Sequence, residues 1–262
     1  MQRVKELFQR NQPVAYTGVI THTLKWLSAP FITTEFKNPK YHGDDHGTVI
    51  YCIHGTFDGP AAFSDLTQKL LADGLPDHIS EIRLVSFTGR YQGNSIEFFA
   101  KQLDEQITKN QHSNVILFGH SRGGLVAAYY SENLAPQKNV KVHGVLAIST
   151  PFKGSTKANS PLKIISTSVE EMQPDSPFLR CLSPKIAAST IPYHYFAAKD
   201  DALVQPDACC IDEHRSRMIT METSHGHLSI LSSNMLVAFV KEILELTVPV
   251  NTTRSSMRPV RR

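Results

Sequence analysis

Hydrophobic and polar positions change their period repeatedly along the chain from Thr48 onward. Short apolar or β-branched runs, typical of strands, occur at 48–53, 82–87, 115–119, 142–149, 192–198 and 218–221. Apolar residues at helical spacing occupy segments near 60–72, 95–109, 121–134 and 228–246. Because strands that alternate with helices build a mostly parallel sheet with helices on both faces, the pattern predicts an α/β fold.

Two segments depart from this alternation. Residues 1–47 have a short amphipathic start, and we expect an antiparallel hairpin or two there. The interval 151–190 spans 40 residues, more than a strand-to-strand crossing needs, and contains several prolines. We interpret it as a small cap of short helices over the carboxyl ends of the strands, where open α/β sheets bind their ligands.

The chain shows no internal repeat and no low-complexity block between two halves. We therefore expect residues 1–248 to form a single domain that includes the cap insertion. Residues 249–262 are polar and basic, and we expect them to be a disordered tail.

Composition narrows the class of protein. Of the 262 residues, 41% are hydrophobic and 19% are charged, which excludes a mostly disordered chain. The net charge of +3 is too small to indicate a nucleic-acid partner.

No stretch approaches the ~20 apolar residues of a membrane span, and the amino terminus lacks the pattern of a secretory signal. The cysteines form no metal or disulfide pattern. Together with the lack of a signal or a membrane span, this favours a cytoplasmic location. Contact with a membrane surface and the oligomeric state stay open.

The strongest chemical signal is the pentapeptide Gly119-His120-Ser121-Arg122-Gly123. It follows an apolar strand and precedes a helical segment, as in the strand-to-helix turn called the nucleophile elbow. Glycines flank such a serine because a side chain there would clash as the backbone turns sharply. The context predicts that Ser121 is a nucleophile at the amino end of a helix.

A serine at an elbow needs a histidine to accept its proton and a carboxylate to orient that histidine. Asp201 follows a predicted strand, and we prefer it to Asp200 because apolar residues come directly after it. His227 directly precedes the apolar positions of the last helix, so we prefer it to His225, which is followed by a glycine. The sequence thus predicts a triad of Ser121, Asp201 and His227.

Two backbone amides are expected to form an oxyanion hole beside Ser121. One is that of Arg122, the residue after the nucleophile. The other is that of Thr56, in the turn His54-Gly-Thr-Phe57 that follows an earlier strand. The cluster at 42–46 has metal-ligand residue types, but its spacing fits no hydrolytic zinc motif, so we expect no metal there.

Over residues 47–246 the sequence resembles the α/β-hydrolase superfamily, and within it the bacterial lipases and esterases and related lipid-deacylating hydrolases. The segment 148–155 is similar to their Thr-Pro-His-x-Gly-Ser/Thr motif, with Phe152 in place of the usual histidine. Residues 168–182 look like their cap segment, with Asp175 in place of a common glycine. The resemblance implies an α/β-hydrolase fold with a short helical cap, the triad above, and cleavage of carboxylic esters.

The sequence therefore predicts a serine hydrolase that cleaves esters of lipids or other acyl compounds through an acyl-enzyme, without a cofactor or metal. Two alternatives stay open. A thioesterase or acyltransferase would use the same triad and differ in acyl donor and acceptor. A catalytically silent binding module would be expected to lack a member of the triad, and none is missing.

Overall fold

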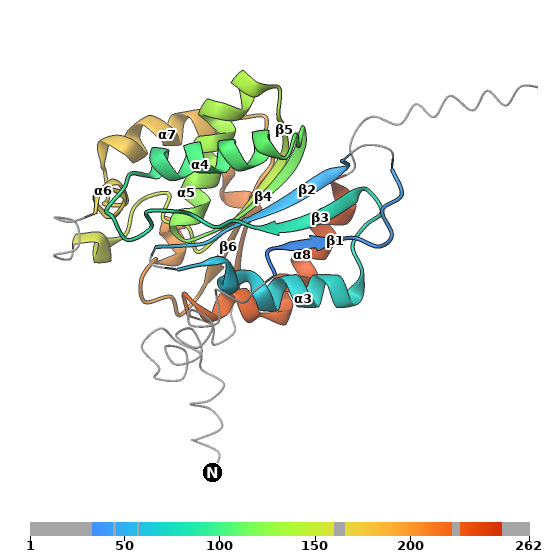
Figure 1. The fold of residues 1–262 in the computed structure, drawn as a ribbon. Helices are drawn as coiled ribbons and strands as arrows, with labels where there is room; N and C mark the ends of the chain where they lie inside the picture. The colour runs from blue at the N-terminus through green and yellow to red at the C-terminus, as the bar shows by residue number, and fades with distance from the viewer. Residues whose placement is uncertain (1–32, 44–45, 57, 160–165, 222–225, 248–262) are drawn as a thin grey trace, which may run out of the picture.

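The computed structural model describes residues 33–43, 46–56, 58–159, 166–221 and 226–247 (Figure 1). Seven strands form one sheet in the order β1-β3-β2-β4-β5-β6-β7. They are β1 (Glu35–Lys37), β2 (Thr48–Ile53), β3 (Ile79–Leu84), β4 (Asn114–His120), β5 (Lys141–Ile148), β6 (Tyr193–Ala198) and β7 (Met218–Met221). β1 pairs antiparallel with β3, and every other pairing is parallel.

Helices cover both faces of this sheet (Figure 1). They are α3 (Ser64–Asp73), α4 (Ile96–Lys109), α5 (Arg122–Tyr129), α6 (Thr167–Glu171), α7 (Pro177–Ala187) and α8 (Asn234–Leu246). One hydrophobic cluster joins the sheet to α4, α5 and α7, and a second joins it to α3 and α8. The predicted α/β-hydrolase fold, a mostly parallel sheet flanked by helices, is confirmed.

The central strands β2 and β4 are buried along nearly their whole length because both of their faces are covered. In β2, Val49, Tyr51 and Ile53 belong to the cluster under α4, whereas Ile50 and Cys52 belong to the cluster under α8. This alternation follows from the two-residue period of a strand. β4 lies between β2 and β5, so the turn that follows its carboxyl end is near the middle of the sheet.

Several boundaries differ from those predicted. β3 begins at Ile79 rather than at residue 82, and Val85 continues the pairing only through its amide, which donates to Cys52 O at 2.9 Å. The helix predicted over 121–134 gives way to a π-helical turn after Tyr129. The last helix begins at Asn234, because the Ser233 side chain accepts the amide of Leu236 and caps it there.

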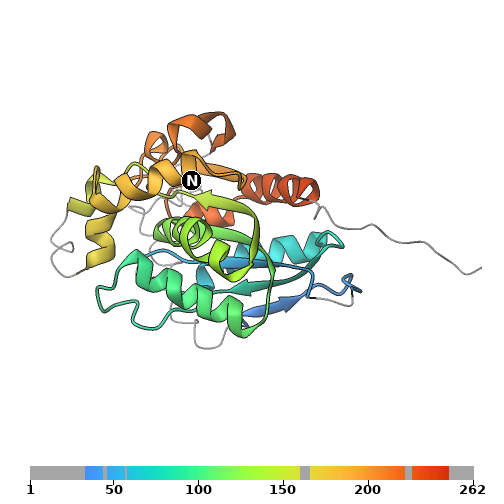
Figure 2. The same ribbon diagram turned by 90° about the horizontal axis from the view of Figure 1, so that it is seen from above.

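At the amino end, the described part of residues 1–47 contributes the single strand β1, which pairs with β3 rather than within a local hairpin. Residues 1–32 and the expected tail 249–262 lie outside the described residues. In the expected cap interval, α6 and α7 lie next to each other at one end of the molecule (Figure 2). Among the described helices, none is long and apolar enough to cross a membrane.

Candidate active site

The turn between β4 and α5 places Ser121 in a strained conformation. Its φ of 54° lies in the left-handed region that serine seldom adopts, and its ψ is −126°. The Ser121 amide donates to Ile148 O of β5 at 2.9 Å, and its carbonyl accepts the amide of Gly124 at 3.0 Å. The chain thus reverses sharply at this residue, between the end of the central strand and the start of a helix.

The glycines on either side of Ser121 are required by close approach. A Cβ on Gly123 would lie 2.1 Å from the carbonyl oxygen of Ile53, at the end of β2. A Cβ on Gly119 would lie 2.4 Å from the Cα of Gly124. Both neighbours are backbone atoms that other strands and helices hold in place, so the tight strand-to-helix turn needs glycine at both positions.

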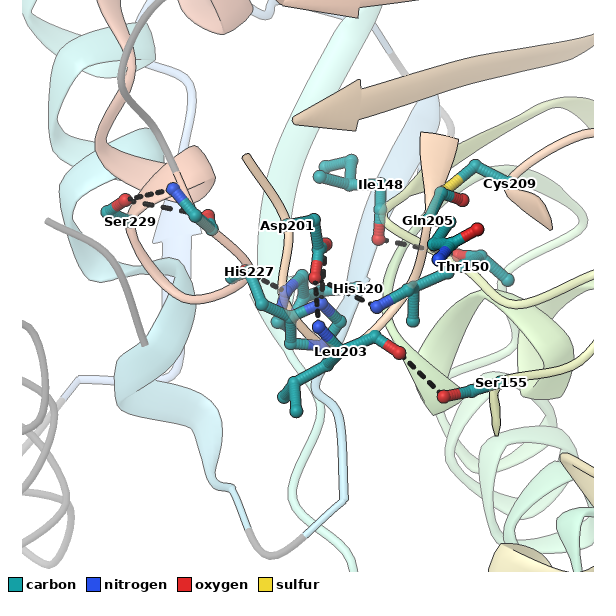
Figure 3. Close-up of polar contacts among 12 residues, drawn as sticks. His120, Ile148, Thr150, Ser155, Asp201, Leu203, Gln205, Cys209, His227 and Ser229 are labelled. Atoms are coloured by element: carbon teal, nitrogen blue, oxygen red, sulfur yellow. Dashed lines mark hydrogen bonds and ion pairs between the residues drawn. The ribbon is translucent and has the colours of Figure 1, made fainter. Parts of the chain in front are cut away.

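Asp201 and His227 form a buried, hydrogen-bonded pair (Figure 3). His227 Nδ1 lies 2.8 Å from Asp201 Oδ2, and Asp201 Oδ1 accepts the amides of Leu203 at 2.8 Å and Val204 at 2.9 Å. Burial raises the pKa of the Asp201 carboxyl, but the hydrogen bonds from His227 and these amides outweigh it and lower the pKa below its ordinary value. The ionised carboxylate accepts the Nδ1 proton, which leaves Nε2 of the neutral ring free to accept another.

His120 ties the elbow to the loop of His227. Its Nε2 lies 2.8 Å from the carbonyl oxygen of His227, and the two rings pack with centroids 4.9 Å apart. A carbonyl only accepts, so Nε2 carries the proton. Burial lowers the pKa of His120 to about 3, which keeps the ring neutral. No role for His120 was predicted from the sequence, although its position inside the pentapeptide is a signal that could have pointed to one.

Two backbone amides stand near Ser121 without acceptors in the described part of the chain. Arg122 is the first residue of α5, where an amide has no partner within the helix. Thr56 follows β2, in a turn so close that a Cβ on Gly55 would lie 3.1 Å from the Ser121 Cβ. These amides and the positive end of α5 favour negative charge beside Ser121.

A cavity of about 220 Å³ brings these groups together. Ser121, Thr56 and His227 line it, and Asp201 lies behind His227. The remaining lining is mainly apolar, with Asp58, His120, Ser155 and Lys157 as its polar members. Its apolar side chains are those of Pro151, Ala158, Val169, Met172, Leu203, Val204 and Leu228. In the described part of the chain no hydrogen bond joins the Ser121 hydroxyl to His227, as is common in sites without a bound substrate.

Of the two alternatives weighed in the sequence, Asp200 lies among the described residues. Asp200 is exposed, whereas Asp201 is buried against the histidine. His225 lies outside the described residues. Two described apolar residues of the interval 151–190 have different surroundings: Met172 lines the cavity, while Phe178 stacks on Tyr129 of α5.

The described residues contain no group of three or more His, Cys, Asp or Glu side chains arranged to hold a metal ion. Two members of the 42–46 cluster, Asp44 and Asp45, lie outside the described part of the chain.

Comparisons with known proteins give the fold and the family. The mature lipase BlEst2 of Bacillus licheniformis superposes with a TM-score of 0.58 at 16% identity, over 80% of this chain and 97% of that one. An esterase of Exiguobacterium antarcticum, EaEST, gives 0.60 at 15% identity, over 80% and 94%. Lipase B of Aspergillus fumigatus gives 0.60 at 14% identity, over 89% and 58%.

At these identities the likeness shows the fold alone. No curated protein matches the sequence. The family model of lecithin:cholesterol acyltransferase matches residues 47–179, which include the elbow, the turn after β2 and most of the interval 151–190. The resemblance to lipase-like α/β-hydrolases is confirmed, and the chain belongs to the lecithin:cholesterol acyltransferase family.

Proposed function

We propose that the protein is a serine hydrolase that cleaves carboxylic esters through an acyl-enzyme on Ser121. The proposal rests on one observation: Ser121, in a strained turn, and His227 line the same cavity. The buried carboxylate of Asp201 is hydrogen-bonded to His227 at its Nδ1. A family of acyltransferases and neighbours named lipase and esterase support ester cleavage or acyl transfer as the general chemistry.

In the first half of the proposed reaction, the Ser121 hydroxyl attacks the ester carbonyl carbon and its proton passes to His227 Nε2. Asp201 holds the ring through Nδ1 and stabilises the imidazolium that forms. The tetrahedral intermediate collapses as the ester C–O bond breaks, and the Nε2 proton goes to the leaving alkoxide. Water or another alcohol then attacks the acyl-enzyme through the same steps.

The amides of Thr56 and Arg122 are proposed to hold the oxyanion of each tetrahedral intermediate. Both are backbone groups, and removal of one such donor typically costs about 10²- to 10³-fold in kcat. The amino end of α5 adds its dipole at the same place.

The cavity is proposed to take the acyl chain. At ~30 Å³ for each water-sized group, its volume of about 220 Å³ accommodates about seven non-hydrogen atoms. This fits an acyl group of about six to eight carbons better than a long fatty chain. Val169 and Met172 belong to the interval 151–190, which we propose to be a cap within a single domain.

Family membership favours a second outcome of the same chemistry, in which an alcohol rather than water accepts the acyl group. Hydrolysis and transfer share the acyl-enzyme and differ only in the acceptor. The fraction of acyl groups released as a new ester, measured at rising concentrations of a primary alcohol, separates the two. A thioesterase would be recognised by higher kcat/KM for a thioester than for the ester of the same acyl group.

The proposal is tested by a matched set of substitutions. Ser121→Ala should lower kcat for a p-nitrophenyl ester by about 10⁴-fold or more, and Asp201→Asn by about 10³-fold or more, with folding intact. Asp200→Asn changes the adjacent exposed carboxylate and should leave kcat within a few-fold. Turnover by folded Ser121→Ala at the wild-type rate would refute the proposal.

A further inference from the structure

Two buried side chains hold the peptide group that links Gly55 to Thr56. His54 Nδ1 lies 3.0 Å from the Gly55 carbonyl oxygen, and Arg122 Nη2 donates to the same oxygen at 3.3 Å. The relative exposures of His54 and Arg122 are 0% and 1%. The Gly55 carbonyl therefore accepts one hydrogen bond from its own turn and one from the side chain of the first residue of α5.

The chemistry of the two donors is distinct. The carbonyl only accepts, so His54 Nδ1 carries the proton. Burial lowers the pKa of His54 to about 4, which makes it a neutral donor at physiological pH. Burial also lowers the pKa of Arg122 to about 10, against the charge of Asp58, so the guanidinium stays charged and its hydrogen bond is charge-assisted.

The guanidinium is itself held in place. It lies over the ring of Phe99 on α4, 4.0 Å from the ring centroid, and its Nη1 donates to Ser168 Oγ on α6 at 3.3 Å. A planar group that is stacked on one side and hydrogen-bonded at both terminal nitrogens has little freedom to rotate. Arg122 can therefore act as a rigid donor toward Gly55.

A trans peptide group is planar, and its C=O and N–H point in opposite directions. The carbonyl of Gly55 and the amide of Thr56 belong to one such group. When the carbonyl is drawn toward His54 and Arg122, the Thr56 N–H must point away from them. The opposite side is where Ser121 lies, because Gly55 adjoins the Ser121 Cβ and Thr56 lines the same cavity.

We propose that His54 and Arg122 are positioning residues that clamp the Gly55–Thr56 peptide with its N–H toward the oxyanion. The inference rests on the proposed function and deepens it. Arg122 then serves both halves of the oxyanion hole: its own amide is one donor, and its side chain fixes the direction of the other. Neither side chain is among those that line the cavity, so the clamp should act on the transition state rather than on substrate binding.

The test compares Arg122→Met and His54→Phe with wild type on a p-nitrophenyl ester and on an alkyl trifluoromethyl ketone, whose adduct with serine carries an oxyanion. Each variant should lower kcat by about 10- to 100-fold, keep KM within about twofold, and weaken the ketone by the same factor as kcat. Arg122→Lys, which keeps a charged donor, should recover part of the loss. The double variant should lose less than the product of the two single losses, because both donors serve one carbonyl.

Ser168→Ala is the graded comparison, since it removes the contact with α6 and leaves both bonds to Gly55. Because Ser168 is only one of the groups that hold the guanidinium, its loss should lower kcat and ketone affinity by a smaller factor than Arg122→Met does. The clamp is overturned if the folded variants keep wild-type kcat, if KM rises while ketone affinity holds, or if Ser168→Ala loses as much as Arg122→Met. If Arg122→Met does not fold, His54→Phe alone tests the clamp. If folded Ser121→Ala still hydrolyses the ester, the proposed function itself is refuted. If Ser121→Ala is inactive but Arg122→Met and His54→Phe keep wild-type kcat, only the clamp is refuted.

Discussion

The size of the cavity predicts how activity depends on acyl-chain length, and Val169→Phe is the most direct perturbation of it. Val169 lies on α6, is 6% exposed and lines the cavity. The substitution adds about four non-hydrogen atoms, or ~120 Å³ at ~30 Å³ for each water-sized group. That is about half of the 220 Å³ present, so the preferred acyl chain should shorten by about four carbons.

The magnitude follows from apolar burial. Each methylene that enters the wild-type cavity contributes up to ~0.8 kcal/mol, or about fourfold in kcat/KM. From a butyryl to an octanoyl ester, four methylenes give up to ~3 kcal/mol, or about 200-fold. Val169→Phe should abolish this gain while leaving acetyl and butyryl esters within a few-fold of wild type.

The assay is a series of p-nitrophenyl esters from acetyl to dodecanoyl, with kcat/KM measured for each. Val237→Phe is the control, because Val237 on α8 is equally buried at 6% exposure but lies in the other hydrophobic cluster. Overpacking at either valine costs about 1–3 kcal/mol of stability, so a change of profile in the control would assign the effect to destabilisation. A wild-type profile that peaks at acetyl, or an unchanged profile in Val169→Phe, would refute the reasoning.

Other perturbations follow from the same structure. Met172→Ser should flatten the chain-length profile more than Phe178→Ser, because Met172 lines the cavity and Phe178 does not; equal profiles would contradict this. Gly123→Ala should abolish activity and lower the melting temperature, since its Cβ would meet a backbone carbonyl at 2.1 Å; a folded, active variant would contradict the elbow. Burial lowers the pKa values of His54 and His120 to about 4 and about 3, so unfolding takes up protons below their ordinary value of 6.5. Stability is then complete above pH 6.5 and falls toward acid by at most about 1.4 kcal/mol per pH unit for each histidine; urea unfolding at pH 7 and pH 5 measures it, and equal midpoints would refute it.

The fold could be predicted because its determinants are local in the sequence. Parallel strands covered on both faces are apolar throughout, so the runs of β2 and β4 stand out against the helical spacing around them. The tight turn at Ser121 could be predicted for the same reason, because its glycines and serine lie within five residues. The order in which the strands pair, and the pairing of β1 with β3, depend on contacts that no local pattern carries.

The candidate site could be predicted from the sequence only as far as its members have local signals. Ser121 carries a motif, and Asp201 and His227 each flank a predicted strand or helix. His120 is hydrogen-bonded to the backbone carbonyl of His227, 107 positions away. Arg122 is hydrogen-bonded to the backbone carbonyl of Gly55, 67 positions away. Since every residue has a carbonyl, the sequence gives no sign of which one a buried side chain will bind.

Boundaries were missed where capping or tertiary pairing decides them. The apolar residues after Leu84 extend the strand pattern, although the regular pairing of β3 ends there. Ser233 stops the last helix from beginning earlier because its hydroxyl caps the amide of Leu236, whereas apolar spacing alone extends the helical pattern to residue 228.

The central claim is that Ser121 forms a covalent bond with the acyl group, and fluorophosphonate labelling followed by peptide mapping tests it most directly. The account predicts one adduct per chain on the peptide that contains Ser121, loss of catalytic activity in proportion to labelling, and neither labelling nor turnover in folded Ser121→Ala. An adduct on another residue that abolishes activity, or undiminished labelling of Ser121→Ala, would contradict it.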